Sequence, residues 1–559
     1  MSRYSTLVSK YVGCAVMVNA KTLAEKLRNC PGKLVSICPG KLASICPGRL
    51  VSIFVLFFIW PAVFVNNSGP PMADAVLLAA IRLVDQQTWT LSDSHDPEVV
   101  ARTAAHDISF FDGQVYSGVG PGASVIAAPF YLPLKPLLGL FDDDVVTNPR
   151  MAYYIQNSRQ LDVPASSHFK SLYLLQVILT WLLIAPLSAS FFVRLDRQLA
   201  TRFDDPTRRL AIMIAIGVGS MMLFYTSMYS RQALAYLLVW HGLLSLMGPH
   251  PLGRASYIIV GCLFGAAFAI DYPSAILIGL TCLGVLWRLP RPQRLGTGTS
   301  LAFPIVIAMG AVALYHWACF DSPFSTPYHH RFWLTPAALA AQGVDLSAFQ
   351  RGAAVGISFP DLAVMARLCF GFFKGLFVYS PILFLGFCGH IIGLRSKRRR
   401  PIHVFCLVLF AAYLAYNSTL GAAVPSHAQH FWGGLAVLWG PRYLFAVIPF
   451  LAWGLTALDW HTPLVRWSCY VALLVSCVIN VGGTMFSHVM MHSPALGADL
   501  QSPLAYAARL LVERGPRLPL LDAYDVGAGV QLASLVALLL GTAALVRNIT
   551  STRTPRASR

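Results

Sequence analysis

The residues best suited to acid–base chemistry lie in residues 67–167, which hold eleven of the chain's 24 acidic residues. Among them are Asp74, Asp107 and Asp112, and a carboxylate can give or take a proton in acid–base chemistry. Asp74 lies nearest the end of the preceding apolar segment. Each has a structural alternative: Asp74 can cap a helix, and the other two can stabilise turns.

Cations and a glycine-rich segment lie at boundaries between apolar and polar segments. Lys374 begins the segment KGLFVYSP, Arg442 lies in WGPRYL, and Arg231 follows Tyr229-Ser230. Tyr116 lies in the glycine-rich segment FDGQVYSGVGPGAS, whose backbone N–H groups could face an anion. We expect these segments to converge on a cavity that binds an amphiphile with a charged head. The alternatives are an aromatic belt with snorkelling cations and an ordinary structured turn.

The composition indicates an integral membrane protein rather than a soluble one. Hydrophobic residues make up 56% of the chain and charged residues 12%, about half the charge content of a typical soluble domain. The net charge of +18 comes from Lys and Arg in short loops between apolar runs. That distribution is typical of cytoplasmic loops, so membrane lipids and not nucleic acid are the expected partners.

The apolar runs and the charge of their loops predict an all-α fold of about twelve transmembrane helices with both termini in the cytoplasm. The predicted spans are about 50–66, 168–193, 210–227, 232–248, 255–270, 273–288, 300–319, 375–393, 402–418, 440–458, 466–488 and 529–546. They divide the chain into a basic tail (1–49), a core (50–460), C-terminal helices with an outer loop at 489–528 (461–546) and a second basic tail (547–559).

Two segments of the long outer loop are predicted to lie on the membrane surface. Asp74–Val84 has apolar residues at helical spacing. Ala123–Phe141 is apolar enough to cross, but three prolines and Lys135 interrupt it. Counting it as a span would place the arginine-rich loop 194–209 outside, so we predict that it does not cross.

Three further features are assigned no chemistry. Residues 30–53 contain three copies of an eight-residue unit, CPGKLVSI, CPGKLASI and CPGRLVSI, which we interpret as a duplication in a cytoplasmic tail. Asp271 lies in a predicted tight turn and is expected to be structural. His329 and His330 are adjacent and point apart, so loop residues are favoured over a metal site; no cofactor is expected, and a divalent metal has no supporting motif.

Over residues 60–460 the chain resembles the GT-C superfamily of membrane glycosyltransferases. The resemblance is carried by four motifs in this order: FDGxxYSxxxPGxS, SPFxTxY, KGLFxYSP and WGGxxxxWGPRYL. The nearest subgroup is bacterial, related to protein O-mannosyltransferases and the lipid A aminoarabinose transferase. The resemblance implies a polyprenyl-phosphate sugar donor and an acceptor at the outer face of the inner membrane. It also implies a first-loop carboxylate as general base, with Asp74 as the first candidate and Asp112 and Asp107 as alternatives. At the donor phosphate it implies Arg442 and Lys374, with Arg231 and Tyr116 as further candidates. The repeat has no counterpart there, and the acidic residue expected just past the first span is not plainly placed.

Two other functions fit the same sequence. One is a transporter or flippase of lipid-linked sugars, which would favour paired inverted repeats that the sequence does not display. The other is a polyprenyl-lipid-binding membrane protein without catalysis. Sugar, acceptor, lipid length and oligomeric state are not readable from the residues.

Overall fold

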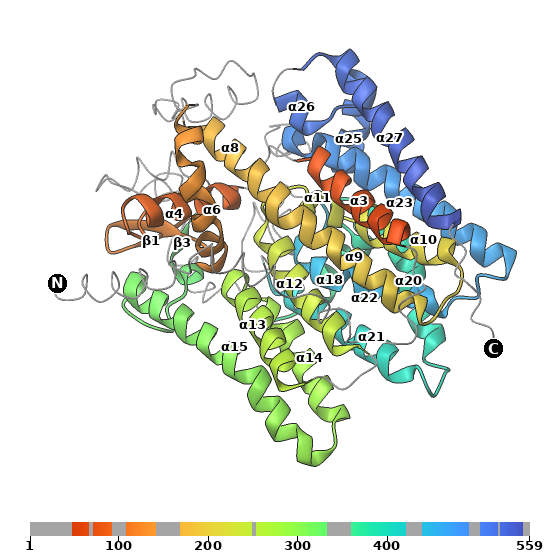
Figure 1. Cartoon of the computed structure of the whole chain (residues 1–559), viewed down its shortest axis with the longest axis horizontal. Coiled ribbons are helices and arrows are strands. Elements are labelled where there is room, and N and C mark those ends of the chain that lie inside the picture. The colour runs from red at the N-terminus through yellow and green to blue at the C-terminus, as the bar shows by residue number, and fades with distance from the viewer. Residues whose placement is uncertain are drawn as a thin grey trace, which may run out of the picture.

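The computed structural model describes residues 47–65, 71–91, 108–140, 168–248, 253–332, 359–420, 439–490, 503–523 and 526–551, which form a mainly helical bundle (Figure 1). Asp107 and the first two copies of the repeat lie outside these residues. The principal helices are α3 (Pro47–Val63), α4 (Pro71–Asp85), α6 (Gly122–Gly139), α8 (His168–Leu179), α9 (Ala185–Ala200), α10 (Pro206–Gly217), α11 (Met222–Thr226), α12 (Arg231–Leu246), α13 (Arg254–Ile270), α14 (Ser274–Arg288), α15 (Arg291–Phe320), α18 (Leu362–Phe370), α19 (Leu376–Tyr379), α20 (Pro381–Gly393), α21 (Arg400–Ser418), α22 (Ile448–Trp453), α23 (Pro463–Met490), α25 (Pro503–Arg514), α26 (Pro519–Ala523) and α27 (Ala528–Ser551).

Among the described residues, five helices are long and apolar enough to cross a membrane. They are Tyr173–Ala200, Arg291–Phe320, Arg400–Ser418, Pro463–Phe486 and Ala528–Ser551. Shorter apolar helices occupy Gly48–Val63, Arg254–Ile270, Ser274–Arg288, Pro381–Gly393 and Arg442–Ala457. The helical membrane class is therefore supported, while the count of twelve spans stays a prediction. The predicted span 210–227 was wrong as a single element, because a turn separates α10 from α11.

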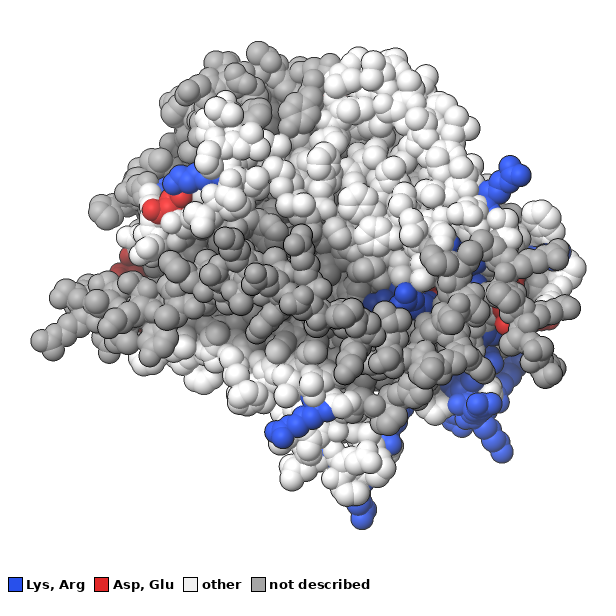
Figure 2. Space-filling model, in the orientation of Figure 1, with Lys and Arg blue, Asp and Glu red and all other residues white. Residues whose placement is uncertain are grey.

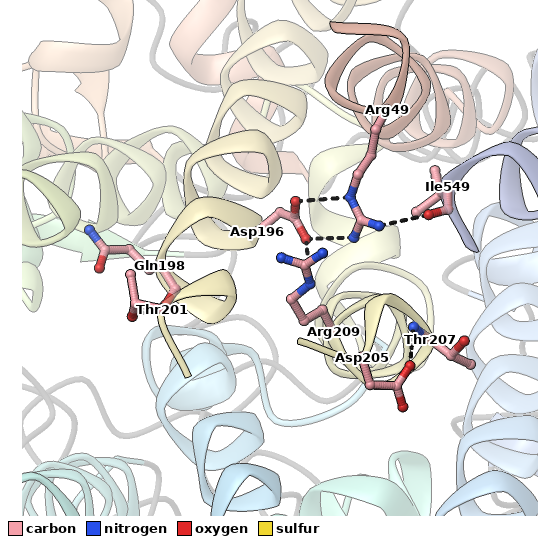
Figure 3. Close-up of polar contacts among 8 residues, drawn as sticks. All are labelled: Arg49, Asp196, Gln198, Thr201, Asp205, Thr207, Arg209 and Ile549. Atoms are coloured by element: carbon pink, nitrogen blue, oxygen red, sulfur yellow. Dashed lines mark hydrogen bonds and ion pairs between the residues drawn. The ribbon is translucent and has the colours of Figure 1, made fainter. Parts of the chain in front are cut away.

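Four helix ends meet around one buried carboxylate. Arg49, in the first turn of α3, donates to Asp196 near the end of α9 through Nη2 at 2.9 Å and Nε at 3.3 Å, and to the Ile549 carbonyl of α27 at 2.7 Å (Figure 3). Arg209 of α10 approaches Asp196 from the other side at 3.5 Å. Because α3 and α10 begin here while α9 and α27 end here, the two pairs run in opposite directions. We call this the basic end of the bundle.

This contact corrects the predicted boundary at residue 49. The third copy of the repeat, CPGRLVSI, enters α3, and its Arg49, Ser52 and Ile53 are buried. The basic residue of that copy is thus part of the folded core rather than of a tail. Its position in the repeat is occupied by Lys33 and Lys41 in the two copies outside the described residues.

The segment FDGQVYS forms a β-hairpin, so the all-α prediction was wrong here. β1 (Ile108–Phe111) and β2 (Gln114–Ser117) pair antiparallel, and β3 (Arg331–Phe332) adds to the free edge of β1. Asp112 and Gly113 have φ of 47° and 70°, as a two-residue hairpin turn requires. The segment that contains the hairpin is therefore joined to the segment that follows α15.

The two predicted surface segments are helices and pack against each other. α4 covers Asp74–Val84, and α6 covers most of Ala123–Phe141 (Figure 1, orange). Asp85 at the end of α4 accepts from the Tyr131 hydroxyl at 2.9 Å and from Lys135 at 2.8 Å. Lys135, one of the residues from which we predicted that this segment does not cross, is thus paired with a carboxylate on the neighbouring helix α4.

Exposed cations gather toward the ends of α14, α15, α20 and α21 (Figure 2, blue). The exposed residues there are Arg288, Arg291, Arg294, Arg395, Lys397, Arg398, Arg399 and Arg400. The helix directions place these loops on the same side as the basic end. This grouping follows the charge pattern from which the cytoplasmic side was predicted.

We expect the hairpin and these basic loops to lie on opposite sides of the membrane. In a variant whose native cysteines are replaced by serine or alanine, Asp112→Cys should react with an impermeant maleimide added outside intact cells. Arg398→Cys should react only after the cells are opened; both positions are exposed. Labelling of both from the same side would contradict the predicted topology.

The buried cluster at the basic end predicts an order of stabilities. Asp196→Asn leaves two buried guanidinium groups without their carboxylate and should cost roughly 3–5 kcal/mol. Arg49→Met keeps the Arg209–Asp196 pair and should cost less, and Arg509→Met, which removes an exposed pair with Glu513, about 0–1 kcal/mol. Thermal unfolding in detergent measures the order; an Arg49→Met protein less stable than Asp196→Asn would contradict it.

Candidate functional site

A buried ion pair lies at the end of the bundle opposite the basic end. Arg231 begins α12, and Asp271 follows α13 in the turn before α14. Arg231 Nε lies 3.5 Å from Asp271 Oδ1, and Nη1 donates to the Tyr328 hydroxyl at 2.8 Å. The ion pair is longer than a usual charge-assisted hydrogen bond, and Nη2 has no hydrogen-bond partner among the described residues. Arg231 is 4% exposed and Asp271 1%.

Two more buried cations lie within electrostatic range of this end of the bundle. Burial raises the pKa of Asp271 above its ordinary value, and the positive charges of Arg231 and Arg442 oppose that rise. Burial, followed by the charge of Arg442, lowers the pKa of Lys374 to about 7. Lys374 is 1% exposed and Arg442 3%. We call Arg231, Lys374 and Arg442, together with Asp271, the cation cluster.

Tyrosines surround the cluster. Arg442 Nη2 donates to the Tyr443 hydroxyl at 2.7 Å, and its guanidinium carbon lies 4.6 Å from the centre of the same ring. Tyr416 packs edge-on against Tyr443, and Tyr328 against Tyr272. The site therefore combines cations with hydroxyl groups that can donate or accept, in surroundings shielded from water.

Asn480 of α23 fixes two of the motifs to each other. Its side-chain oxygen accepts from the Trp439 indole at 3.1 Å, and its nitrogen donates to the Tyr379 carbonyl at 2.7 Å. Trp439 also occupies the space left by Gly483, where a Cβ would lie 2.0 Å from the indole. Trp439 and Tyr379 are each 1% exposed, so these aromatics belong to the protein interior and not to a membrane belt.

The structure buries Arg231, Lys374 and Arg442 within electrostatic range at one end of the bundle, whereas Tyr116 packs against α15. The ring of Tyr116 packs on Phe320 with centroids 5.2 Å apart, and burial raises its pKa to about 12. Asp112 is exposed at the hairpin turn, and its positive φ is consistent with the alternative role of a turn residue. Asp74 lies in the first turn of α4 rather than capping it, its side chain is outside the described part, and Asp107 is not described.

The glycines after the hairpin serve close packing. A Cβ at Gly122 would lie 2.6 Å from the Ala269 carbonyl carbon, and one at Gly120 2.7 Å from the Ala269 oxygen. Their lack of a side chain lets the start of α6 contact the end of α13, just before Asp271. The interpretation of this stretch as an anion-binding turn has no support from these contacts.

Sequence reasoning missed the partners of the cluster. Asp271 was assigned a structural role, and Tyr328 and Asn480 were not selected. A lone aspartate in the DYP turn, adjoining an apolar helix, was the available signal, because a carboxylate at such a depth requires a cation. Tyr328 and Asn480 carry no such signal, because their roles depend on contacts between distant segments.

The described residues contain no group of three or more His, Cys, Asp or Glu side chains placed to hold a metal ion. His329 and His330 instead contact Thr326 and Ser325. Comparisons with protein-family models, curated proteins and solved structures found no match for the chain. The GT-C relationship therefore remains a prediction from the motifs.

The low pKa of Lys374 predicts a pH-dependent stability. An unfolded lysine has a pKa of about 10.4, so between about pH 7 and 10 the unfolded chain binds a proton that the native protein does not. Stability should therefore rise with pH through this window, by on the order of a few kcal/mol, and not change from this group below about pH 7. Lys374→Met should lose the rise; identical pH profiles for both proteins, measured by thermal unfolding without added lipid, would contradict the assignment.

Proposed function

We propose that the cation cluster binds the phosphate of a polyprenyl-phosphate sugar and that the protein transfers the sugar to an acceptor at the same face of the membrane. The observation that carries the proposal is the burial of Arg231, Lys374 and Arg442, from three distant segments, at one end of an apolar helix bundle, where the charge of Arg442 acts on both Lys374 and Asp271. An intramembrane or boundary cation is costly to bury, which makes such a group a functional candidate.

The electrostatics favour an anionic ligand with a permanent charge. Lys374 has a lowered pKa because it is buried beside Arg442, and an anion in the cluster would raise that pKa again. Arg231 has an available Nη2, which could donate to a phosphate oxygen while Nε keeps its ion pair with Asp271 at 3.5 Å. Arginine is suited to this contact because its planar fork matches two phosphate oxygens.

The surroundings favour a lipid as the carrier of that phosphate. The cluster lies where α12, α13 and α21 have their ends, so an apolar tail could remain beside the helices while the head reaches the cations. In the proposed reaction, an acceptor hydroxyl oxygen attacks the anomeric carbon, and the bond between that carbon and the phosphate oxygen breaks. The bonding electrons leave with the phosphate, whose charge the cations stabilise.

The hydroxyl proton requires a base, for which the first outer loop remains the proposed source. Asp74 is still the first candidate, with Asp107 and Asp112 as alternatives. The hairpin joins the first loop to the segment that contains Tyr328, so the loop is tethered near a direct partner of Arg231. Asp271 is proposed to position Arg231 and not to act as the base.

The position of the cluster favours transfer over transport. Transporter sites usually lie near the middle of the membrane, between broken helices, so that both sides have access. Here the cations lie at helix ends. A protein that binds the lipid without catalysis would use the same cluster, and loss of transfer on replacing the first-loop aspartates, with lipid binding kept, would distinguish an enzyme from such a protein.

Arg442 and Arg231 variants test the phosphate site. Arg442→Ala and Arg231→Gln should each weaken binding of polyprenyl phosphate by about 10- to 100-fold, as expected for roughly 1.5–3 kcal/mol from a charged hydrogen bond. Arg442→Lys should bind with intermediate affinity because it keeps the charge and loses the fork. Once a donor is known, Arg442→Ala should cost on the order of 2–4 kcal/mol in transfer.

The matched control is Arg509→Gln, which removes an exposed arginine from α25 and should bind as the unmodified protein does. Melting temperatures show whether an arginine binds lipid or only stabilises the fold. A variant that has lost lipid affinity and keeps its melting temperature has lost a binding residue. Unchanged affinity in both Arg442→Ala and Arg231→Gln, whatever their stability, would remove the cluster from the lipid site.

A further inference from the structure

A second candidate site lies toward the basic end, away from the cation cluster. A cavity of about 240 Å³ is lined by residues of α9, α12, α14, α21 and α22, and most of its lining is apolar. Arg288 ends α14 and lines the cavity with its exposed side chain. The neighbouring Trp287 is 85% exposed, as is typical of an aromatic residue at a membrane–water boundary.

Three lining residues carry polar atoms that the described part of the protein leaves unsatisfied. They are the indole nitrogens of Trp240 and Trp453 and the hydroxyl of Thr281, and all three residues are more than nine-tenths buried. Buried donors without an acceptor are uncommon because each costs about 1–3 kcal/mol. Because these three atoms are themselves shielded from a water-sized probe, they add no polar surface to the cavity, whose interior suits an apolar group.

Two lining residues of α14, Thr281 and Arg288, indicate how a ligand with an anionic head and an apolar tail would lie. Thr281 and Arg288 are seven residues apart, so they are on the same face, separated by about 10 Å along the helix axis. A ligand with its anionic group at Arg288 would therefore extend its apolar part past Thr281 into the cavity.

We propose that this cavity binds one acyl chain of an anionic glycerophospholipid, with the phosphate at Arg288. The apolar lining suits the acyl chain, and the exposed guanidinium of Arg288 at the rim suits the phosphate. The cationic loops around Arg288 complement an anionic head group. The proposal is independent of sugar transfer, because it uses different residues at the other end of the helices.

A cavity-filling variant tests the proposal. A Cβ at Gly284 would have Phe405 at 3.9 Å as its only close neighbour, so the backbone accepts a side chain that projects into the cavity. The matched control is Gly279→Leu on the same helix, at an exposed position with open space around it. Both changes replace a helical glycine with a better helix former.

Binding of palmitoyl-oleoyl phosphatidylglycerol to the full-length protein in detergent should be followed by native mass spectrometry. We expect one tightly bound lipid on the unmodified protein and on Gly279→Leu, and at least tenfold weaker binding to Gly284→Leu. Arg288→Gln, whose change is on the exposed rim, should remove the preference for phosphatidylglycerol over phosphatidylcholine. Equal binding to all four proteins, or displacement of the lipid by equimolar polyprenyl phosphate, would overturn the proposal.

Discussion

The cost of burying charge among apolar helices is the constraint on which the arrangement of this protein depends. At the basic end, one carboxylate, Asp196, is shared by Arg49 and Arg209, and this holds the ends of four helices together. At the other end, Asp271 lies 3.5 Å from Arg231 and is also influenced by the charge of Arg442. In an environment without water, neither carboxylate can be separated from its arginine at low cost, so both ends of the bundle are fixed. The proposed phosphate site is built on this rigid frame.

Several motif residues that were expected to bind a ligand instead pack helices together. Asn480 links the WGPRYL and KGLFVYSP segments, and Gly120 and Gly122 let α6 approach the end of α13. The aromatic and glycine residues of the motifs are therefore largely packing residues, which hold Arg442, Lys374 and Asp271 in place. The WGPRYL and KGLFVYSP motifs therefore each contain packing residues and a buried cation. We assign the proposed chemistry to the cation.

Much of the fold could be predicted, because apolar runs and loop charges act locally. The helices near 255–270, 273–288 and 402–418, and the surface helices α4 and α6, follow from those patterns. The hairpin was missed because its pattern is short and was interpreted from its glycines. We expected the segments that carry the three cations to converge, because all were predicted on the same side of the membrane. The roles of Asp271 and Asn480 could not be predicted, because their partners lie far away in the sequence and only packing brings them together.

The two ends of the bundle thus present different chemistry: a buried cluster of cations and tyrosines at one, and an apolar cavity beneath a basic rim at the other. A structure of the protein with bound polyprenyl phosphate would test the central claim most directly. The account predicts a phosphate oxygen within hydrogen-bond distance of Arg231 Nη2, with Arg442 or Lys374 on another oxygen of the same phosphate. A phosphate bound at Arg288, or anywhere that leaves the contacts of the cation cluster unchanged, would contradict it.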